Sequence, residues 1–234
     1  MIQKKQKKQN NPVLIPEWPA PGWIHACTTL RSIDLSRSPR PLLCPLLPEL
    51  PREPLWLKQT HGTGVLRADL IQPDTHADAS FSVTPGEVCA VLTADCLPVL
   101  LCDQNEKRIA AIHAGWRGLA ASIIQATVKA ADFKPGQTLA WLGPAIGPDH
   151  FEVGEEVREI FLKRWPDAHA DFRPLKNAKW LADIYALARL QLLDAGISAV
   201  TGGEYCTIRD SQLFFSFRRE KENAGRMATL IWMT

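Results

Sequence analysis

The feature that most constrains this fold is the alternation of short apolar runs with segments of helical periodicity. Apolar runs bounded by Gly, Pro, Asn or Asp are typical of β-strands. Strands that are interleaved with helices favour the α/β class. The runs predict strands at residues 23–29, 55–58, 79–83, 88–93, 97–102, 108–112, 138–142, 198–201, 214–217 and 228–232.

Three segments show helical patterns. Apolar residues recur at helical spacing over Gly118–Ala131. Val153–Trp165 has acids early and bases late, as the helix dipole favours, and Trp180–Ala195 ends at Gly196. Because no linker separates these elements, we expect one α/β domain over residues 23–234, with layered mixed β-sheets flanked by helices.

The N-terminal segment differs in composition from the rest. Lys, Gln, Asn and Pro dominate residues 1–22, which predicts a flexible basic tail, and Pro-rich residues 38–54 exclude regular helix or central strand. No secretion-signal pattern is present, and the longest apolar stretch, Cys89–Cys102, is interrupted by Asp95 and Pro98. We therefore expect a cytoplasmic protein with no membrane partner.

The charge distribution argues against nucleic-acid binding. The chain has 27 Lys plus Arg and 25 Asp plus Glu, a net charge of +2. Four of the lysines lie in the first eight residues, so the remainder has 23 basic against 25 acidic residues. A basic tail is not a basic face, and we expect no nucleic-acid partner. The four are Lys4, Lys5, Lys7 and Lys8.

Three apolar runs end in turn-forming segments that carry a candidate metal ligand. LWLKQTHGTG places His61, VCAVLTADC places Cys96 and IAAIHAGWRG places His113. Ligands collect outside the carboxyl ends of strands in α/β sheets, so the three side chains could meet. Two imidazoles and a thiolate form a three-ligand zinc set with one position left open. Each residue taken alone is more often structural.

The other cysteines are expected to be packing residues. A reducing cytosol favours buried thiols over a disulfide framework, with one metal or catalytic group at most. Apart from Cys96, the thiols are Cys27, Cys44, Cys89, Cys102 and Cys206.

Residues near the candidate ligands add further chemistry. Glycines follow both histidines and permit close approach of the backbone to a small ligand. Because His113 precedes a strand-to-helix turn, backbone N–H groups and Arg117 could bind an anion such as phosphate. Trp116 could stack on a base or pack on the sheet, and Asp95 could orient a ligand, act as a base or cap a turn. The glycines are Gly62, Gly64, Gly115 and Gly118.

Longer motifs occur together in this chain: KQTHG (58–62), TADCLPVL (93–100), AIHAGWRG (111–118), GPAIGP (143–148), FFSFRR (214–219) and GRMA (225–228). Together they resemble the laccase-domain family, from about residue 23 to the C-terminus. Members were once described as multicopper polyphenol oxidases and are now treated as purine nucleoside phosphorylases. Some are called peptidoglycan editing factors.

The resemblance implies a Zn²⁺ site made by His61, Cys96 and His113, which are also the expected catalytic residues. It implies phosphorolysis of adenosine, inosine, guanosine and methylthioadenosine, and deamination of adenosine. It also implies an α/β/β/α fold likened to cysteine hydrolases. With Arg117 and Lys58 as phosphate-binding residues, the expected partners are purine nucleosides and phosphate. The oligomeric state is left open.

Two segments depart from the family pattern. Where members usually have cysteine and an aromatic residue after GPAIG, this chain has Asp149-His150-Phe151-Glu152, and 30–35 replaces a Gly-Gly turn and an Asn-Leu motif. His150 and Glu152 match the His-x-Glu of zinc nucleobase deaminases, but no Pro-Cys-x-x-Cys follows, so we discount that family. Roles for the missing cysteine and for loop 30–35 are not carried over.

Three alternatives stay open. A copper-dependent polyphenol oxidase could use the same three ligands with Cu²⁺, although six histidines are few for several copper sites and only Met1, Met227 and Met233 could supply an axial sulfur. A cysteine hydrolase acting on peptidoglycan precursors would use Cys96 and His113. A metal-stabilised interaction protein would have no turnover.

Overall fold

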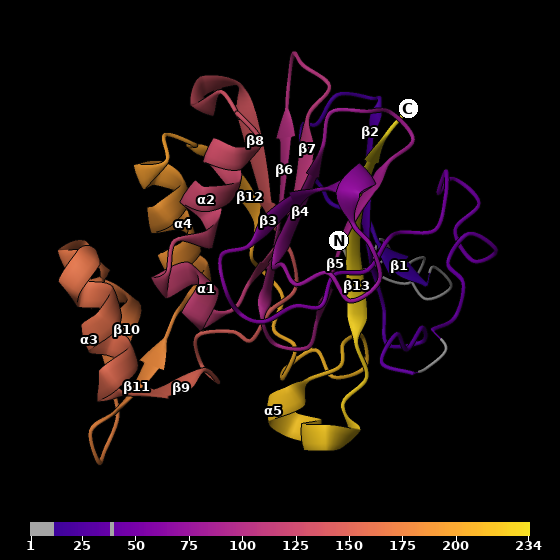
Figure 1. Ribbon diagram of the computed structural model, residues 1–234. Coiled ribbons are helices and arrows are strands. Elements are labelled where there is room, and N and C mark those ends of the chain that lie inside the picture. The colour runs from indigo at the N-terminus through magenta and orange to yellow at the C-terminus, as the bar shows by residue number, and fades with distance from the viewer. Residues whose placement is uncertain (1–11, 38–39) are drawn as a thin grey trace, which may run out of the picture.

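The computed structural model describes residues 12–37 and 40–234, and its two larger sheets pack face to face (Figure 1). The larger sheet is mixed, because β6 is antiparallel to β7 and β8 whereas the edge pairs are parallel. Its strand order is β12 (Ala199–Gly202), β8 (Thr138–Leu142), β6 (Leu97–Asp103), β7 (Ile109–Ala114), β4 (Ala79–Ser82) and β3 (Val65–Arg67).

The other two sheets are antiparallel. The four-stranded sheet has the order β1 (Val13–Leu14), β2 (Ile24–Thr29), β13 (Met227–Met233) and β5 (Val88–Thr93). A small sheet has the order β10 (Phe172–Pro174), β11 (Lys179–Ala182) and β9 (Glu152–Gly154).

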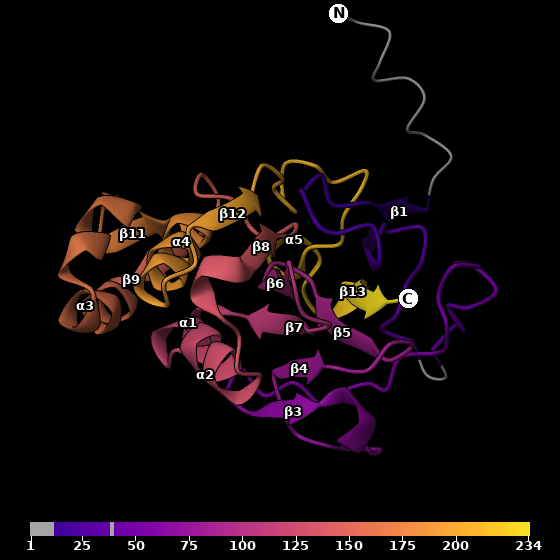
Figure 2. The same cartoon turned by 90° about the horizontal axis from the view of Figure 1, so that it is seen from above.

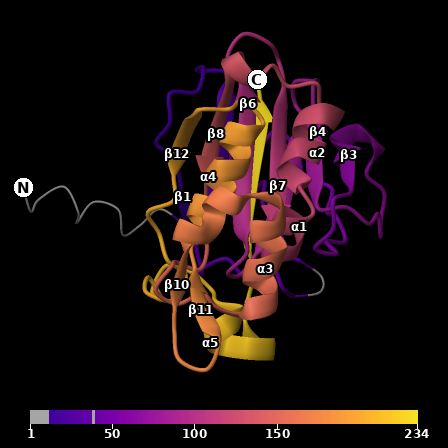
Figure 3. The same cartoon turned by 90° about the vertical axis from the view of Figure 1, so that its left-hand side faces the viewer.

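Helices α1 and α2 lie on the outer face of the six-stranded sheet, α4 packs beside them, and α3 packs against β9 and β11 of the small sheet (Figure 3). They are α1 (Trp116–Ala120), α2 (Ile123–Ala130), α3 (Glu155–Arg164) and α4 (Ile184–Asp194), and a fifth, α5 (Phe217–Glu220), lies near the C-terminus. Short 3₁₀ helices cover Ala68–Leu70, Pro135–Gln137, Pro166–Asp171 and Lys221–Asn223.

The central strand β6 shows why the sheets are layered. All its residues are buried, and their side chains alternate between the two faces of the sheet. Val99 and Leu101 pack with the helices, whereas Leu100 and Cys102 pack between the two sheets. A continuous apolar run therefore fits a strand covered on both sides, and the predicted α/β class with layered mixed sheets and flanking helices is confirmed.

The outer face of the four-stranded sheet is covered mainly by the Pro-rich segment. Leu35, Leu43 and Leu50 pack against Val88 and Leu230 of that sheet, and no helix is assigned to the described residues of this segment. Figure 2 shows these loops on the side away from the helices. The sequence expectation that Pro excludes regular elements there is confirmed.

The segment predicted to be a flexible tail belongs to the fold from residue 12 onward. Residues 1–11 lie outside the described residues, but Val13–Leu14 pairs with β2, and Trp18 packs against the core between the sheets. The flexible tail predicted over 1–22 was therefore wrong for the residues from 12 onward. Apolar side chains between the prolines pack on the core, and Val13–Leu14 pairs with the edge of the four-stranded sheet.

Three predicted elements were wrong in detail. The helix predicted over 118–131 is two helices, because Ser122 has a φ of 71° and interrupts the ladder. The strand predicted at 55–58 is only one bridge, from Lys58 to His76. The strand predicted at 214–217 is instead a turn leading into α5, where the Ser216 hydroxyl accepts from the Arg219 N–H.

The two remaining helices begin later than predicted, at 155 and 184, because Glu152–Gly154 and Lys179–Ala182 form strands first. The Asp183 side chain starts α4 by accepting from the N–H groups of Tyr185 and Ala186. Within the described part of the chain, no helix is long and apolar enough to cross a membrane.

Candidate metal and substrate site

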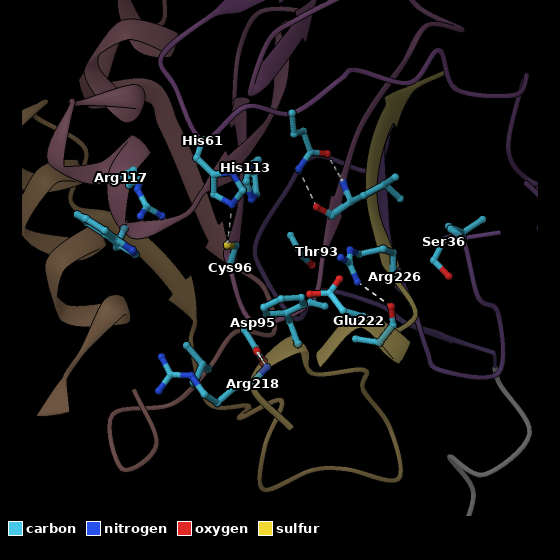
Figure 4. Close-up of a pocket in the computed structure, with 18 of the residues that line it drawn as sticks. Ser36, His61, Thr93, Asp95, Cys96, His113, Arg117, Arg218, Glu222 and Arg226 are labelled. Carbon is cyan, nitrogen blue, oxygen red and sulfur yellow. Dashed lines mark hydrogen bonds between the residues drawn. The ribbon is translucent and has the colours of Figure 1, made fainter. Parts of the chain in front are cut away.

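The structure brings His61, Cys96 and His113 together at one end of the sheets (Figure 4). One ligand atom from each lies within 4.8 Å of the others. The Cys96 Sγ is 3.8 Å from the His61 Nε2, and the two imidazole rings meet edge to face with centroids 4.8 Å apart. We call this group the ligand trio.

Strand pairing explains how two members of the ligand trio meet. The chain crosses from the four-stranded sheet to the six-stranded sheet between β5 and β6, and Cys96 lies in that crossing. Because β6 is antiparallel to β7, its first residue, Leu97, pairs with Ala114, beside His113. The sequence analysis expected the three ligands to meet because the carboxyl ends of strands converge in α/β sheets. That reason was wrong for Cys96 and His113, since the start of β6 lies beside the end of β7.

The third member, His61, is held by Asp78, which the sequence analysis missed. The Asp78 carboxylate is fully buried and accepts hydrogen bonds from the backbone N–H groups of Thr60, His61 and Gly62 at 2.8 to 3.2 Å. It also pairs at 2.8 Å with the Nδ1 of His113. Asp78 therefore fixes both histidines, and leaves the Nε2 of His113 as its free ligand atom.

The sequence signal for Asp78 is weak, because one Asp before a short apolar run is common. Its role follows from β4 pairing with β7, where Ala79 lies opposite Ile112. A second unpredicted contact comes from Gln59, whose side chain bonds the backbone N–H and C=O of Leu92 at 2.7 Å each. This contact attaches the His61 loop to β5.

Electrostatics favours ionised forms in the ligand trio. Burial opposes ionisation of Asp78, but hydrogen bonds from His113, Gly62 and Thr60 outweigh it and hold its pKa below the usual range. Desolvation opposes the Cys96 thiolate, yet the two histidines lower its pKa to about 6. Burial likewise opposes protonation of His113, but Asp78 and Cys96 raise its pKa to about 9. Both shifts favour a thiolate beside an imidazolium near neutral pH in the metal-free protein.

Two glycines make room for this packing. A Cβ on Gly115 would lie 3.1 Å from both the Cys96 Sγ and the His61 Cδ2. A Cβ on Gly118 would lie 3.2 Å from the carbonyl oxygen of Gly62. The need for glycine here is steric, because both have ordinary negative φ values.

The ligand trio opens into a cavity of about 900 Å³. Five basic side chains and two acidic ones line it. Within residues 12–37 and 40–234, none of the basic ones forms an ion pair with a carboxylate. The cavity therefore favours an anionic ligand. The basic residues are Arg40, Lys58, Arg117, Arg218 and Arg226.

Both predicted phosphate-binding residues reach this cavity. Lys58 and Arg117 are exposed and line it. The Arg117 guanidinium lies 4.4 Å from the ring centroid of Trp116, which is itself half-buried and lines the cavity. Leu35, the last residue of the loop that departs from the family pattern, and Ser36, which follows it, line the cavity as well.

The remaining candidates lie outside the ligand trio. The hydrogen bonds of the Asp95 side chain go to Thr207 and Arg218 rather than to the three ligand side chains. The Nδ1 of His150 is 3.4 Å from the Sγ of Cys206, and Glu152 lies in β9. His150 and Glu152 therefore do not join the candidate metal centre.

The donor set fits a zinc ion. Zn–N bonds of about 2.0 Å and Zn–S bonds of about 2.3 Å place tetrahedral ligand atoms roughly 3.3 to 3.6 Å apart. The Cys96 sulfur and the His61 nitrogen are 3.8 Å apart, close to this spacing, and the other separations, up to 4.8 Å, would have to shorten on binding. His61, Cys96 and His113 could thus hold a metal ion at the wall of the cavity.

The fold and site define a layered α/β protein with a candidate metal centre inside a cationic cavity. A family model described as multi-copper polyphenol oxidoreductase laccase matches residues 40–234. The chain therefore belongs to the laccase-domain family, as the sequence motifs predicted.

Individual relatives match nearly the whole chain. An Escherichia coli (strain K12) protein named purine nucleoside phosphorylase YfiH is 43% identical over 242 residues, covering 94% of this chain and 98% of that protein. A Pseudomonas aeruginosa protein, also named a purine nucleoside phosphorylase, is 43% identical over 241 residues, covering 95% and 99%. The crystal structure of a Neisseria meningitidis protein matches with a TM-score of 0.84 at 39% identity, covering 95% of this chain and 99% of that one.

Proposed function

We propose that this protein is a zinc-dependent purine nucleoside phosphorylase of the cytoplasm. The observation that carries the proposal is one cavity that contains both the ligand trio and five basic side chains free of carboxylate partners among the described residues. The names of the relatives support the same activity. The proposed substrates are phosphate and the nucleosides adenosine, inosine, guanosine and methylthioadenosine.

The cavity has the size and charge that two substrates need. Its volume of about 900 Å³ is near the upper end for small-molecule sites, so a nucleoside and a phosphate can lie side by side. Arg117 and Lys58 bind the phosphate dianion, and Trp116 offers an aromatic edge for a base.

In phosphorolysis a phosphate oxygen forms a bond to C1′ while the bond from C1′ to the purine nitrogen breaks, and the electron pair leaves with the base. Positive charge develops on the sugar, so a fixed phosphate dianion both attacks and stabilises that charge. Arg117 and Lys58 hold the dianion against C1′ and exclude part of its water. Asp78 keeps the two imidazoles in place throughout.

Zinc, when bound, would supply a Lewis acid that orients phosphate or lowers the pKa of a water. The latter chemistry supports adenosine deamination as a second activity of this site. It predicts inosine formation from adenosine in the absence of phosphate. A protein that forms no inosine from adenosine, and releases adenine only when phosphate is added, would contradict the deaminase activity and leave the phosphorylase in place.

A phosphate-dependent screen of purified protein against purine nucleosides tests the main proposal, beside Cys96→Ala. Wild type should release base and the variant should not, and zinc should be stoichiometric by atomic emission. Equal base release by both proteins would refute the proposed site.

Two other activities make different predictions. A polyphenol oxidase would show stoichiometric copper and phenol turnover without base release from inosine. Among the described residues only one group of three potential ligands occurs, and the Met227 sulfur accepts a hydrogen bond from the Phe215 N–H, so a second copper site has no support. A cysteine hydrolase, favoured by the lowered pKa of Cys96, would act without metal and be blocked by alkylation.

A further inference from the structure

Asp95 connects the metal-ligand turn to the C-terminal wall of the cavity. One carboxylate oxygen accepts from the Thr207 hydroxyl at 2.5 Å, and the other accepts from the backbone N–H of Arg218 at 2.6 Å. These partners lie 112 and 123 positions away along the chain. Figure 4 shows Asp95 below Cys96, with its bond directed to the backbone of Arg218.

The backbone of Asp95 connects the same turn to a further segment that lines the cavity, at Ile146. Its carbonyl oxygen accepts from the N–H of Ile146 at 2.9 Å, and its φ is 87°. A non-glycine residue with such a φ is uncommon and persists only where its surroundings hold it. Cys96, a candidate metal ligand, follows Asp95 directly in the chain. Asp95 therefore fixes the position of the turn that carries Cys96 relative to the segment that carries Arg218.

The position of Arg218 depends on these contacts. Helix α5 has only four residues, too few to be stable alone. Its first turn is held by Ser216, which accepts from the Arg219 N–H at 3.2 Å, and by Asp95. The Arg218 side chain is exposed, lines the cavity and has one hydrogen bond among the described residues, to the backbone carbonyl of Glu152 at 3.2 Å.

We propose that Asp95 is a positioning residue that holds Arg218 at the cavity as a further phosphate-binding side chain, beside Arg117. The proposal rests on the proposed phosphorylase function for its ligand. In the view of Figure 4, Arg117 lies to the left of the ligand trio and Arg218 lies below it and to the left, whereas Ser36 and Arg226 lie to the right. Asp95, which is next to the candidate metal ligand Cys96 in the chain, thereby determines where Arg218 can bind phosphate. It does so without binding metal or phosphate itself.

The decisive variant is Asp95→Asn. Asn tolerates a positive φ, but it has one acceptor oxygen where Asp95 has two, so the Thr207 hydroxyl and the Arg218 N–H can no longer each donate to a separate oxygen. We expect the KM for phosphate to rise about tenfold, because a displaced binding group loses alignment with its ligand. The KM for inosine, the kcat at saturating phosphate and the zinc affinity measured with a competing chelator should each stay within about twofold of wild type.

A double-mutant cycle with Arg218→Ala separates positioning from a general structural effect. Arg218→Ala alone should raise the KM for phosphate by a similar factor, and adding Asp95→Asn should raise it no further, since both changes act through one side chain. Additive effects would overturn the proposal. Asp103→Asn serves as the matched control, because Asp103 lies at the other end of β6, accepts from the backbone N–H groups of Asn105 and Glu106 and does not line the cavity; it should leave the KM for phosphate unchanged.

Direct binding of inorganic phosphate to the zinc-loaded protein, measured by titration calorimetry, distinguishes the two proposals. If no nucleoside is turned over but phosphate binds and both variants weaken it, the phosphorylase is wrong and the role of Asp95 is correct. If both variants bind phosphate as wild type does, or if Asp95→Asn loses zinc with phosphate binding unchanged, the role of Asp95 is wrong. If wild type binds no phosphate, both proposals fail.

Discussion

Two cysteine–histidine pairs in this molecule have similar distances and different surroundings. The Cys96 sulfur lies 3.8 Å from a His61 nitrogen, and the Cys206 sulfur lies 3.4 Å from a His150 nitrogen. The shorter pair is not the candidate metal centre. Proximity of sulfur and imidazole is therefore a poor guide to metal binding by itself.

The difference lies in what surrounds each sulfur. Cys96 has His113 as a second imidazole, and the buried carboxylate of Asp78 bonds the His113 ring and the backbone N–H of His61. The Cys206 sulfur instead accepts from the backbone N–H groups of Gly147 and Arg209 at 3.2 and 3.5 Å, and that residue is only 4% exposed. The first sulfur is available to a ligand in the cavity, whereas the second is used in packing.

The largest expected effect comes from exchanging one sulfur in each pair. Cys96→Ala should lose stoichiometric zinc and lower phosphorolysis at least about a hundredfold, because a ligand matters more than the groups behind it. Cys206→Ser should keep stoichiometric zinc, measured by atomic emission on the purified proteins. Loss of zinc from both variants would remove the distinction between the pairs.

Asp78→Asn tests the carboxylate that the Cys206 pair lacks. The amide cannot accept all of the N–H groups around it, and the His61 loop loses its anchor. We expect zinc affinity to fall about 10- to 100-fold in a chelator competition assay. An unchanged affinity would show that strand pairing alone orients the histidines.

Each pair also has a glycine against its sulfur, which gives a matched comparison. A Cβ on Gly115 would lie 3.1 Å from the Cys96 sulfur, and a Cβ on Gly147 would lie 3.1 Å from the Cys206 sulfur. Gly115→Ala should weaken zinc binding about tenfold by displacing ligands. Gly147→Ala should instead lower the free energy of unfolding by about 1 to 3 kcal/mol, through overpacking, with zinc binding intact. Chelator competition and urea unfolding are measured on both variants. Weaker zinc binding by Gly147→Ala, with zinc binding by Gly115→Ala unchanged, would contradict the comparison.

The smallest expected effect is a flat pH response. In metal-free protein the Cys96 thiol loses its proton as the pH rises through about 6, so its alkylation rate should increase up to about pH 7 and then change less than about twofold to pH 9. Burial raises the pKa of Cys27 to about 12, so labelling there should still be increasing at pH 9. Mass spectrometry of protein treated with iodoacetamide at each pH measures the alkylation rates of both cysteines. A Cys96 rate that keeps rising tenfold per unit to pH 9 would contradict the thiolate–imidazolium pair.

Much of the fold could be predicted from the sequence because a buried strand appears there as one continuous run of apolar residues. The runs at 88–93, 97–102 and 138–142 coincide with β5, β6 and β8 to within one residue. Their side chains are buried on both faces, so an apolar run is enough to mark them. The run at 55–58 has the same local appearance, but the Gln59 side chain takes the hydrogen bonds that a strand would have made with Leu92.

The site was predicted in part for a similar reason. His61, Cys96 and His113 are chemically distinctive residues that follow apolar runs, so their types marked them. Asp78 and Asp95 are ordinary acids in the sequence, and their partners lie 35 and 123 positions away. Nothing local marks a carboxylate whose hydrogen-bond donors come from distant segments.

The sequence by itself determined the class of fold, the family and the three residues that could hold a metal, because periodicity, motif and side-chain chemistry are properties of neighbours in the chain. Only the tertiary structure decided which cysteine–histidine pair faces a cavity, which carboxylate orients the histidines and which residue holds Arg218. Those roles depend on desolvation and on hydrogen bonds between strands and loops far apart in the sequence. Such interactions exist only once the sheets have packed.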